Sequence, residues 1–273
     1  MMCRLLQVSR SGCYAAHNRP LSLRSREDVA LRSRIEELHK DQYRAPGVIK
    51  MWRLLSAEGV MCGRNRVARL RRIAGIETLR MARFRSMRTH QNTEPPAPDL
   101  VQRRFAMEAP NLVWVGDFTQ IPTRKGPIHL AAYHDLCTHS VTGWSISSTS
   151  QTAKLAITAL QMGIERRKPP AGLICHTDQG SQFGAKTYRD LLRDKKILPS
   201  MSRKGNCHDN AVAESFFSNL KNELTHHVIF EDHESAVVAI TKYIEVYYNQ
   251  KRLHQTLGYR TPAQVEALHS APN

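Results

Sequence analysis

The spacing of apolar residues changes along the chain, and this change divides the chain into two parts. In the first ninety residues, apolar positions recur every three or four residues, which is typical of helices with one buried side. The pattern predicts one helix capped by Ser25 and a second helix after a break at 43–47. The apolar stripes consist of Val29, Leu31, Ile35 and Leu38 in the first helix and of Val48, Met51, Trp52 and Leu55 in the second.

A third helix is predicted at 63–74, directly after a tight turn at 58–60. Its buried side consists of Val67, Leu70, Ile73 and Ala74, and its other positions carry five arginines, namely Arg64, Arg66, Arg69, Arg71 and Arg72. A helix, a short turn with glycine and an arginine-rich helix together indicate a helix-turn-helix that contacts DNA. The alternative is a small helical bundle whose basic side is only solvated.

Beyond residue 108 the apolar residues occur in the short runs and alternations of β-strands. Strands are expected at 112–119, 128–136, 141–149, 172–176 and 197–201, and helices at 151–167, 185–195, 211–226 and 232–248. This order predicts an α/β fold, with a ribonuclease-H-like mixed sheet flanked by helices and preceded by the small all-α region. The predicted segments are the basic helical region 1–90, a proline-rich linker 91–108, the sheet-containing core 109–228, and a C-terminal helix and tail 229–273 packed on that core.

Charge is distributed as unevenly as the apolar pattern. The chain has 40 Lys and Arg against 24 Asp and Glu, a formal net charge of +16. Residues 1–90 hold 20 basic and 7 acidic residues, a net of +13, so residues 91–273 hold the remaining 20 basic and 17 acidic residues, a net of +3. A strongly basic part joined to a nearly neutral one indicates a nucleic-acid-binding region beside a working domain, although a basic surface also serves solubility alone.

Other features of the composition exclude several classes of protein. A hydrophobic content of 41% argues against intrinsic disorder. The six cysteines never occur as C-x-x-C, so neither a disulfide framework nor a zinc finger is indicated. No apolar run approaches the ~18–20 residues that span a bilayer, and the N-terminal apolar stretch is too short for a secretory signal. We therefore expect a cytoplasmic protein with no membrane partner.

Three acidic residues occupy positions at which an α/β sheet can carry out chemistry. Asp117 lies inside the first apolar strand, where a carboxylate is costly unless it is paired or binds a metal. Asp178 directly follows the fourth strand, at an end where open α/β sheets bind ligands. Glu214 lies near the start of the helix 211–226. Each acid alone has an ordinary structural interpretation, but their joint placement predicts a site for Mg²⁺ or Mn²⁺.

The helix that contains Glu214 has distinct sides. At about 100° per residue, Glu214 shares one side with Lys221, and the apolar face is centred roughly 120° away. That face consists of Ala213, Phe216, Leu220 and Leu224. Lys221 is therefore expected to contact a DNA phosphate beside the metal site, as are Arg203 and Lys204 from the polar loop before the helix.

Several stretches carry a resemblance to a known family. They are WVGDFT (114–119), HTDQGSQF (176–183), SMSRKGNCHDNAVAESFFSNLKNE (200–223), CRLLQVSRSGCY (3–14) and YNQKRLHQTLGYRTPAQ (248–264). Together they resemble the DDE transposases with a retroviral-integrase-like core, in particular the second-reading-frame subunit of insertion sequences of the IS-three type. The 35 residues between Asp178 and Glu214 match the spacing of that family, and Lys221 matches its basic residue.

The resemblance implies a mechanism and partners. Two Mg²⁺ or Mn²⁺ ions per active site, held by Asp117, Asp178 and Glu214, would support cleavage and strand transfer of double-stranded DNA, both element terminal inverted repeats and target. It also implies at least a homodimer on DNA and a possible fusion to an upstream first-frame protein. Thr138, His139, Phe183 and His208 depart from the pattern of the family, and none of them is one of the three acids.

Two other functions are compatible with parts of this sequence. A catalytically silent DNA-binding regulator or transposase remnant would bind DNA with a steep salt dependence and without cleavage. A ribonuclease-H-like nuclease would cleave without strand transfer. The three acids argue against the first, and the arginine-rich region and the C-terminal signature argue against the second.

Overall fold

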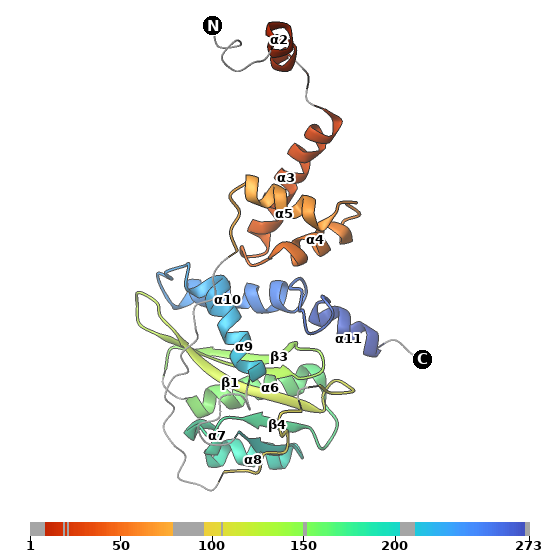
Figure 1. Ribbon diagram of the computed structural model, residues 1–273. Helices are drawn as coiled ribbons and strands as arrows, with labels where there is room; N and C mark the ends of the chain where they lie inside the picture. Colours follow the sequence, from red (N-terminus) through yellow and green to blue (C-terminus); the bar gives the residue numbers. More distant parts are fainter. Residues whose placement is uncertain are drawn as a thin grey trace. The chain divides into compact units, whose positions relative to one another are not determined.

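The computed structural model describes residues 9–18, 20, 22–78, 96–104, 106–149, 152–202 and 211–270. They belong to two compact units, Met1–Thr78 and Leu79–Asn273, each with its own hydrophobic core. Figure 1 shows an all-helical first unit and a second unit built around a sheet. None of the helices in these ranges is long and apolar enough to cross a membrane.

The first unit consists of α2 (Arg10–Asn18), α3 (Leu23–Asp41), α4 (Val48–Ala57) and α5 (Arg64–Ile73). The last three form a core because their apolar stripes meet, with Ile35, Met51, Leu55 and Val67 fully buried. The predicted cap of α3 was wrong, since the side chain of Ser22 accepts the hydrogen bond and Ser25 donates it through its backbone N–H.

The boundaries of α4 and α5 agree with the predicted helices, and the turn between them depends on one glycine. Gly59 has a φ of +81°, which glycine adopts without steric cost, and the N–H of Val60 then donates to the carbonyl of Leu55 at 2.9 Å. Val29 and Ile73, which were expected on the buried sides, are exposed. The apolar stripe of this unit is therefore narrower than the sequence pattern suggests.

The second unit contains the predicted mixed sheet. Its strands are β1 (Val113–Ile121), β2 (Ile128–Asp135), β3 (Val141–Ser147), β4 (Ile174–Thr177) and β5 (Leu198–Met201), in the order β3-β2-β1-β4-β5. The first three strands are antiparallel neighbours, and β4 and β5 add in parallel on the side of β1. Because β1 lies in the centre, it is buried over most of its length.

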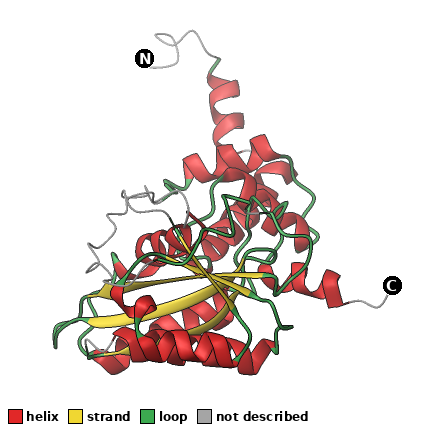
Figure 2. Cartoon of the chain, turned by 90° about the horizontal axis from the view of Figure 1, so that it is seen from below, coloured by secondary structure: helices red, strands yellow, loops and turns green. Residues whose placement is uncertain are grey.

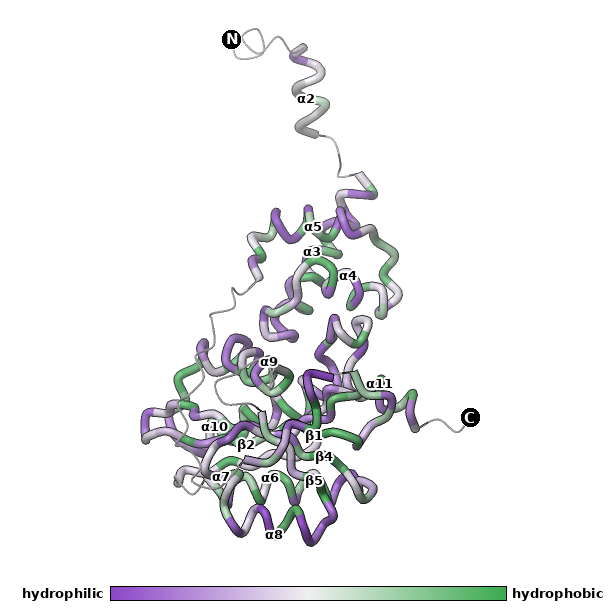
Figure 3. The backbone as a smooth tube through the Cα atoms, turned by 60° about the horizontal axis from the view of Figure 1, so that its bottom comes forward, coloured by the Kyte–Doolittle hydropathy of each residue, from purple (hydrophilic) through white to green (hydrophobic). Residues whose placement is uncertain are grey.

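Helices cover both faces of this sheet (Figure 2). On one face, α6 (Thr152–Arg167) and α8 (Lys186–Asp194) share a core with the strands that includes Trp114, Tyr133 and Tyr188. In Figure 3 hydrophobic and hydrophilic colours alternate along α8, as expected of a helix with one buried side. Gly143 lets α6 approach β3 closely, since a Cβ there would lie 2.2 Å from the carbonyl oxygen of Ala159.

The opposite face carries the C-terminal third of the unit. The predicted helix 211–226 is α9 (Ala211–Leu220) continued by a π-helix, η2 (Lys221–Thr225), and the predicted helix 232–248 is α10 (His233–Lys242) continued by η3 (Tyr243–Tyr248). Three helices were not predicted, namely α2 in the first unit and, in the second, the short α7 (Ser181–Gly184) and α11 (Pro262–Ser270). Both π turns change the side to which the following residues point, which the helical wheel did not anticipate.

Candidate functional site

Asp117 lies on the face of β1 that packs under α9. Earlier on the same face of β1, Val113 and Val115 are buried in a cluster with Ala213 of α9. The Asp117 side chain is half-buried, and its Oδ1 accepts a hydrogen bond from the N–H of Phe118 at 2.8 Å. The strand thus presents one carboxylate to the space beside the α9 helix.

Asp178 lies next to Asp117 across neighbouring strands. In the parallel pair of β1 and β4, Val115 is opposite His176, so the positions two residues further along are Asp117 and Asp178. Asp178 follows the end of β4, and its Oδ1 accepts a hydrogen bond from the N–H of Gly180 at 2.9 Å. This bond forms the turn that leads into α7.

Glu214 is brought to the same region by the packing of α9 against β1 and β2. Ala213, Phe216 and Leu220 are fully buried and Leu224 is buried as well, which confirms the apolar face predicted for this helix. Phe217, which was not assigned to that face, is also buried. Glu214 follows directly on Ala213, which contacts the β1 cluster, and its side chain is half-buried. Asp209 and Asn210 are residue types that cap helices and directly precede α9, but they lie outside the described residues.

Electrostatics link the three acids. Burial raises the pKa of Asp117 well above its ordinary value, and the charges of Asp178 and Glu214 raise it further. The Lys221 ammonium acts on the pKa of Asp117 in the opposite direction. Burial lowers the pKa of Lys221 itself, and Asp117 opposes that shift. Three carboxylates and one ammonium therefore interact within a small, partly desolvated region.

The donor set fits a hard divalent cation. Carboxylate oxygens are the ligands that Mg²⁺ and Mn²⁺ prefer, and a cation would relieve the repulsion that raises the pKa of Asp117. In the described part of the chain, no three His, Cys, Asp or Glu side chains already surround a common point. The acids would therefore turn toward a shared ion on binding, as side chains of unliganded sites often do.

His176 has a packing and hydrogen-bonding role in this region. It is fully buried, and its Nδ1 lies 2.8 Å from the Oγ of Ser200. The same hydroxyl accepts a hydrogen bond from the N–H of Leu100 at 2.9 Å. The imidazole thus fastens β5 and the segment before β1 to β4.

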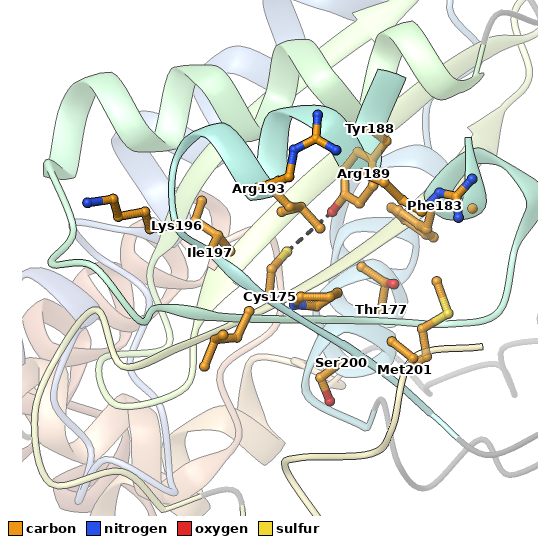
Figure 4. Close-up of a pocket in the computed structure, with 15 residues that line it drawn as sticks. Cys175, Thr177, Phe183, Tyr188, Arg189, Arg193, Lys196, Ile197, Ser200 and Met201 are labelled. Atoms are coloured by element: carbon orange, nitrogen blue, oxygen red, sulfur yellow. Dashed lines mark hydrogen bonds between the residues drawn. The ribbon is translucent and has the colours of Figure 1, made fainter. Parts of the chain in front are cut away.

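A separate cavity lies on the other face of the sheet. It has a volume of about 470 Å³ and is enclosed by α8 and the strands β4 and β5, as Figure 4 shows. Cys175 and Tyr188, which contact each other at 3.3 Å, form part of its wall. Cys175 and Thr177 alternate along β4 with His176 and Asp178, so this cavity opens away from the acids.

The predicted DNA-contacting arginines of α5 differ in their surroundings. Arg66 and Arg69 form ion pairs with Asp28 of α3, and Arg66 also pairs with Glu27 at 2.9 Å. Hydrogen bonds from Arg69 and Arg66 lower the pKa of Asp28. These two guanidinium groups are therefore oriented by α3 rather than free to rotate in solvent.

The other predicted contacts fall into three groups. Arg71 is buried and donates to the carbonyl oxygen of Pro46 at 2.7 Å, so a direct DNA contact would require the unit to open. Arg64 and Arg72 are exposed, with the Arg64 guanidinium 5.8 Å from the centroid of the Trp52 ring. The predicted contacts Arg203 and Lys204 lie outside the described residues, in 203–210.

Sequence reasoning missed one polar cluster close to α9. Glu223 and Arg252 form a buried ion pair with Nη2–Oε1 at 2.8 Å, and the hydroxyl of Tyr243 donates to Glu223 at 2.7 Å. The available signal was an acid between apolar positions of a predicted helix. Its partner, an arginine in the C-terminal signature, could not be identified from spacing because it is 29 residues away.

Comparisons with known proteins agree with this architecture. An integrase core domain family matches residues 107–207, a second family of integrase core domains matches 195–262, and a family of HTH-like domains matches 26–84. The chain is 37% identical over 262 residues to the insertion element IS600 uncharacterized 31 kDa protein of Shigella sonnei, covering 96% of each.

Two further likenesses concern a transposase and a viral protein. The chain is 35% identical over 270 residues to transposase InsF for insertion sequence IS3A of Escherichia coli, with 97% of this chain and 92% of the relative covered. The fold resembles that of a chain in the simian T-cell lymphotropic virus intasome, solved with the PP2A regulatory subunit B56 gamma. The TM-score is 0.50 at 16% identity, over 88% of this chain and 75% of the other.

Proposed function

Because the chain belongs to the family of insertion-sequence transposases with an integrase core domain, we propose that it cleaves DNA at element ends and transfers the strands to a target through Asp117, Asp178 and Glu214. The observation that carries this assignment is geometric: the register of β1 and β4 places Asp117 beside Asp178, and Glu214 follows Ala213, which packs on the same face of β1. The charges of Asp178 and Glu214 add to burial in raising the pKa of Asp117, as expected of acids that lie close together.

These acids are the proposed ligands of two Mg²⁺ or Mn²⁺ ions. Bound there, divalent ions supply an activated water or 3′-hydroxyl and stabilise the leaving oxygen of an in-line displacement. The N–H groups of Phe118 and Gly180 donate to one oxygen of Asp117 and of Asp178, which orients each carboxylate. The burial of β1 and α9 limits the access of water from beneath the site.

Basic residues are proposed to bind the phosphates. Lys221 lies in electrostatic contact with Asp117, so its ammonium would neutralise a phosphate placed beside the acids. Arg203 and Lys204 would contact the same backbone. In the helical unit, the exposed Arg64 and Arg72 would contact DNA directly, and Arg66 and Arg69 would do so from positions set by Asp28.

The proposed substrates are the terminal inverted repeats of the element and a double-stranded target. Joining two ends requires at least two active sites, so we propose a homodimer or larger assembly on DNA. We also propose that the chain is fused to an upstream first-frame protein. The protein would act on nucleoid DNA in the cytoplasm.

The assignment is tested by replacing Asp178 with Asn. Asp178→Asn keeps the size of the side chain but removes a charge that the ions require, so cleavage and strand joining should fall at least ~10³-fold, a loss of about 4 kcal/mol of transition-state stabilisation. The measurement is cleavage and joining of a duplex that carries the terminal repeat of the encoding element, with Mg²⁺ or Mn²⁺.

The matched control is Asp194→Asn, which removes an exposed carboxylate at the end of α8. It should leave both reactions within about twofold of the unsubstituted chain, because an exposed ion pair contributes little. Cleavage that persists in Asp178→Asn would overturn the assignment. Binding without cleavage by the unsubstituted chain would indicate the silent regulator instead.

A further inference from the structure

One buried carboxylate anchors the π turn that follows the α9 helix. Glu223 lies in the π-helix η2, which continues α9 without a break, and its side chain is 7% exposed. Its two oxygens accept hydrogen bonds from Nε and Nη2 of Arg252 at 2.8–3.1 Å and from the hydroxyl of Tyr243 at 2.7 Å. A fork of this kind fixes both the distance and the orientation of the carboxylate.

The cation comes from the C-terminal segment, which is itself anchored to the sheet. Asn249 accepts from the N–H of Val141 at 2.9 Å and donates to its carbonyl oxygen at 3.1 Å, so it pairs with the edge strand β3. The Arg252 guanidinium lies over the ring of Tyr248, 5.7 Å from its centroid. The Tyr248 ring in turn meets Phe216 of α9 edge-on, with centroids 4.9 Å apart.

Burial makes this pair dependent on its geometry. Burial is the largest single influence on the pKa of Arg252 and lowers it, but the interactions with Glu223, Tyr243 and Tyr247 together raise the pKa above its ordinary value. The Arg252 guanidinium therefore keeps its charge inside the unit, where an ion pair is favourable only with well-formed hydrogen bonds. Glu223 and Arg252 consequently hold one relative position.

This position matters because of where the π turn lies. A π turn inserts one residue into a helix, is uncommon, and is frequent at functional sites. Here it begins at Lys221, one residue after the last α-helical residue Leu220 and seven after Glu214. If η2 relaxed to an α-helix, the residues from Asn222 onward would rotate relative to Glu214. Because those residues are buried in the unit, the change would be transmitted to Lys221 and displace it from its place beside Asp117.

We propose that Glu223, Arg252 and Tyr243 are positioning residues, which lock the π turn so that Glu214 and Lys221 keep their places against Asp117. The C-terminal segment thus acts on the reaction from behind the α9 helix and without touching DNA or metal. This inference rests on the proposed function, because it assigns a role relative to the three acids.

The test removes the cluster without leaving a buried charge. The variant Glu223→Met, Arg252→Met, Tyr243→Phe replaces all three polar partners by apolar groups of similar volume, a change that is often neutral for stability. Two measurements follow on the full chain: the single-turnover cleavage rate at saturating terminal-repeat DNA, and backbone amide hydrogen exchange in residues 211–225. The dissociation constant for the same DNA is measured in parallel.

The expected result is a rate at least 30-fold lower, DNA affinity within threefold, and faster exchange confined to residues 211–225. The matched control is Arg167→Met with Glu266→Met, which removes a half-exposed ion pair between α6 and α11 in the same unit. The control should cleave within threefold of the unsubstituted chain. A triple variant that cleaves within threefold of the unsubstituted chain overturns the proposal.

Arg252→Lys decides the matter if the triple variant does not fold. It retains a cation for Glu223 but loses the two-point fork, so about tenfold slower cleavage with unchanged DNA affinity supports positioning, and an unchanged rate overturns it. If the unsubstituted chain does not cleave DNA, the proposed function fails and the positioning role fails with it. If only the positioning role is wrong, Asp178→Asn is still inactive, whereas the variants of Glu223, Arg252 and Tyr243 cleave DNA like the unsubstituted chain.

Discussion

Asp135 offers a stringent test of how the sheet is held together, because its two oxygens have different tasks. The residue ends β2 and is 1% exposed. Its Oδ1 accepts hydrogen bonds from the N–H groups of Cys137 and Thr138, both at 2.9 Å, which shape the turn before β3. Its Oδ2 accepts from the N–H of Asn111, which precedes β1.

Asp135→Asn preserves the shape of the side chain but leaves only one acceptor oxygen. If that oxygen serves the turn, the amide NH₂ faces the N–H of Asn111, and a buried donor is left without an acceptor. Loss of a hydrogen bond to a charged group costs about 1.5–3 kcal/mol, and an unsatisfied buried donor about 1–3 kcal/mol. Because the two costs overlap, we expect the free energy of unfolding of the second unit to fall by about 2–4 kcal/mol.

The assay is urea unfolding followed by tryptophan fluorescence in a Trp52→Phe background, so that only Trp114 and Trp144 of the second unit report. Asp99→Asn is the matched control, because both of its backbone bonds, from Val101 and Gln102, go to one oxygen. An asparagine can keep both of them, so the control should lose less than about 1 kcal/mol. Equal losses for the two substitutions would refute the reasoning.

Two further predictions concern the acids and the arginines. The raised pKa of Asp117, due to burial and then to Asp178 and Glu214, means that its stabilising contribution is complete below the unfolded value of 3.8 and is lost as the pH rises through the folded pKa. Asp117→Asn should therefore raise the stability of the chain at pH 8 in EDTA and change its stability little at pH 4. Thermal unfolding at the two pH values measures this, and an equal change in stability at both would contradict the prediction. Arg64→Ala with Arg72→Ala should weaken DNA binding and reduce the slope of log K against log salt by about 2, and an unchanged slope in a salt titration would argue against phosphate contacts there.

Most elements of the fold could be predicted because their signals are local. The five strands and the helices α3 to α6, α8, α9 and α10 follow from runs and periods of apolar residues, within a few residues at each end. The failures have local causes too. The four-residue α7 is too short to show a period, and α11 starts at a proline after a segment rich in turns.

The sequence by itself determined which residue types were available and which of them share a face of a strand or helix. Period two on β1 placed Asp117 on the same face as Val113 and Val115, and the apolar side of α9 determined that Glu214 borders the packed core. These conclusions needed no knowledge of distant contacts, because backbone geometry sets the direction of each side chain within one element.

Only the tertiary structure decided which charged groups meet across the chain. Asp28 pairs with Arg66 and Arg69 some forty residues away, Arg71 turns inward to Pro46, and Glu223 meets Arg252. An ion pair or a buried guanidinium produces no periodic pattern in the sequence, because tertiary packing and not sequence spacing determines which residue is its partner. The π turn at Lys221 belongs to the same class, since the contacts that accompany it come from the end of the chain.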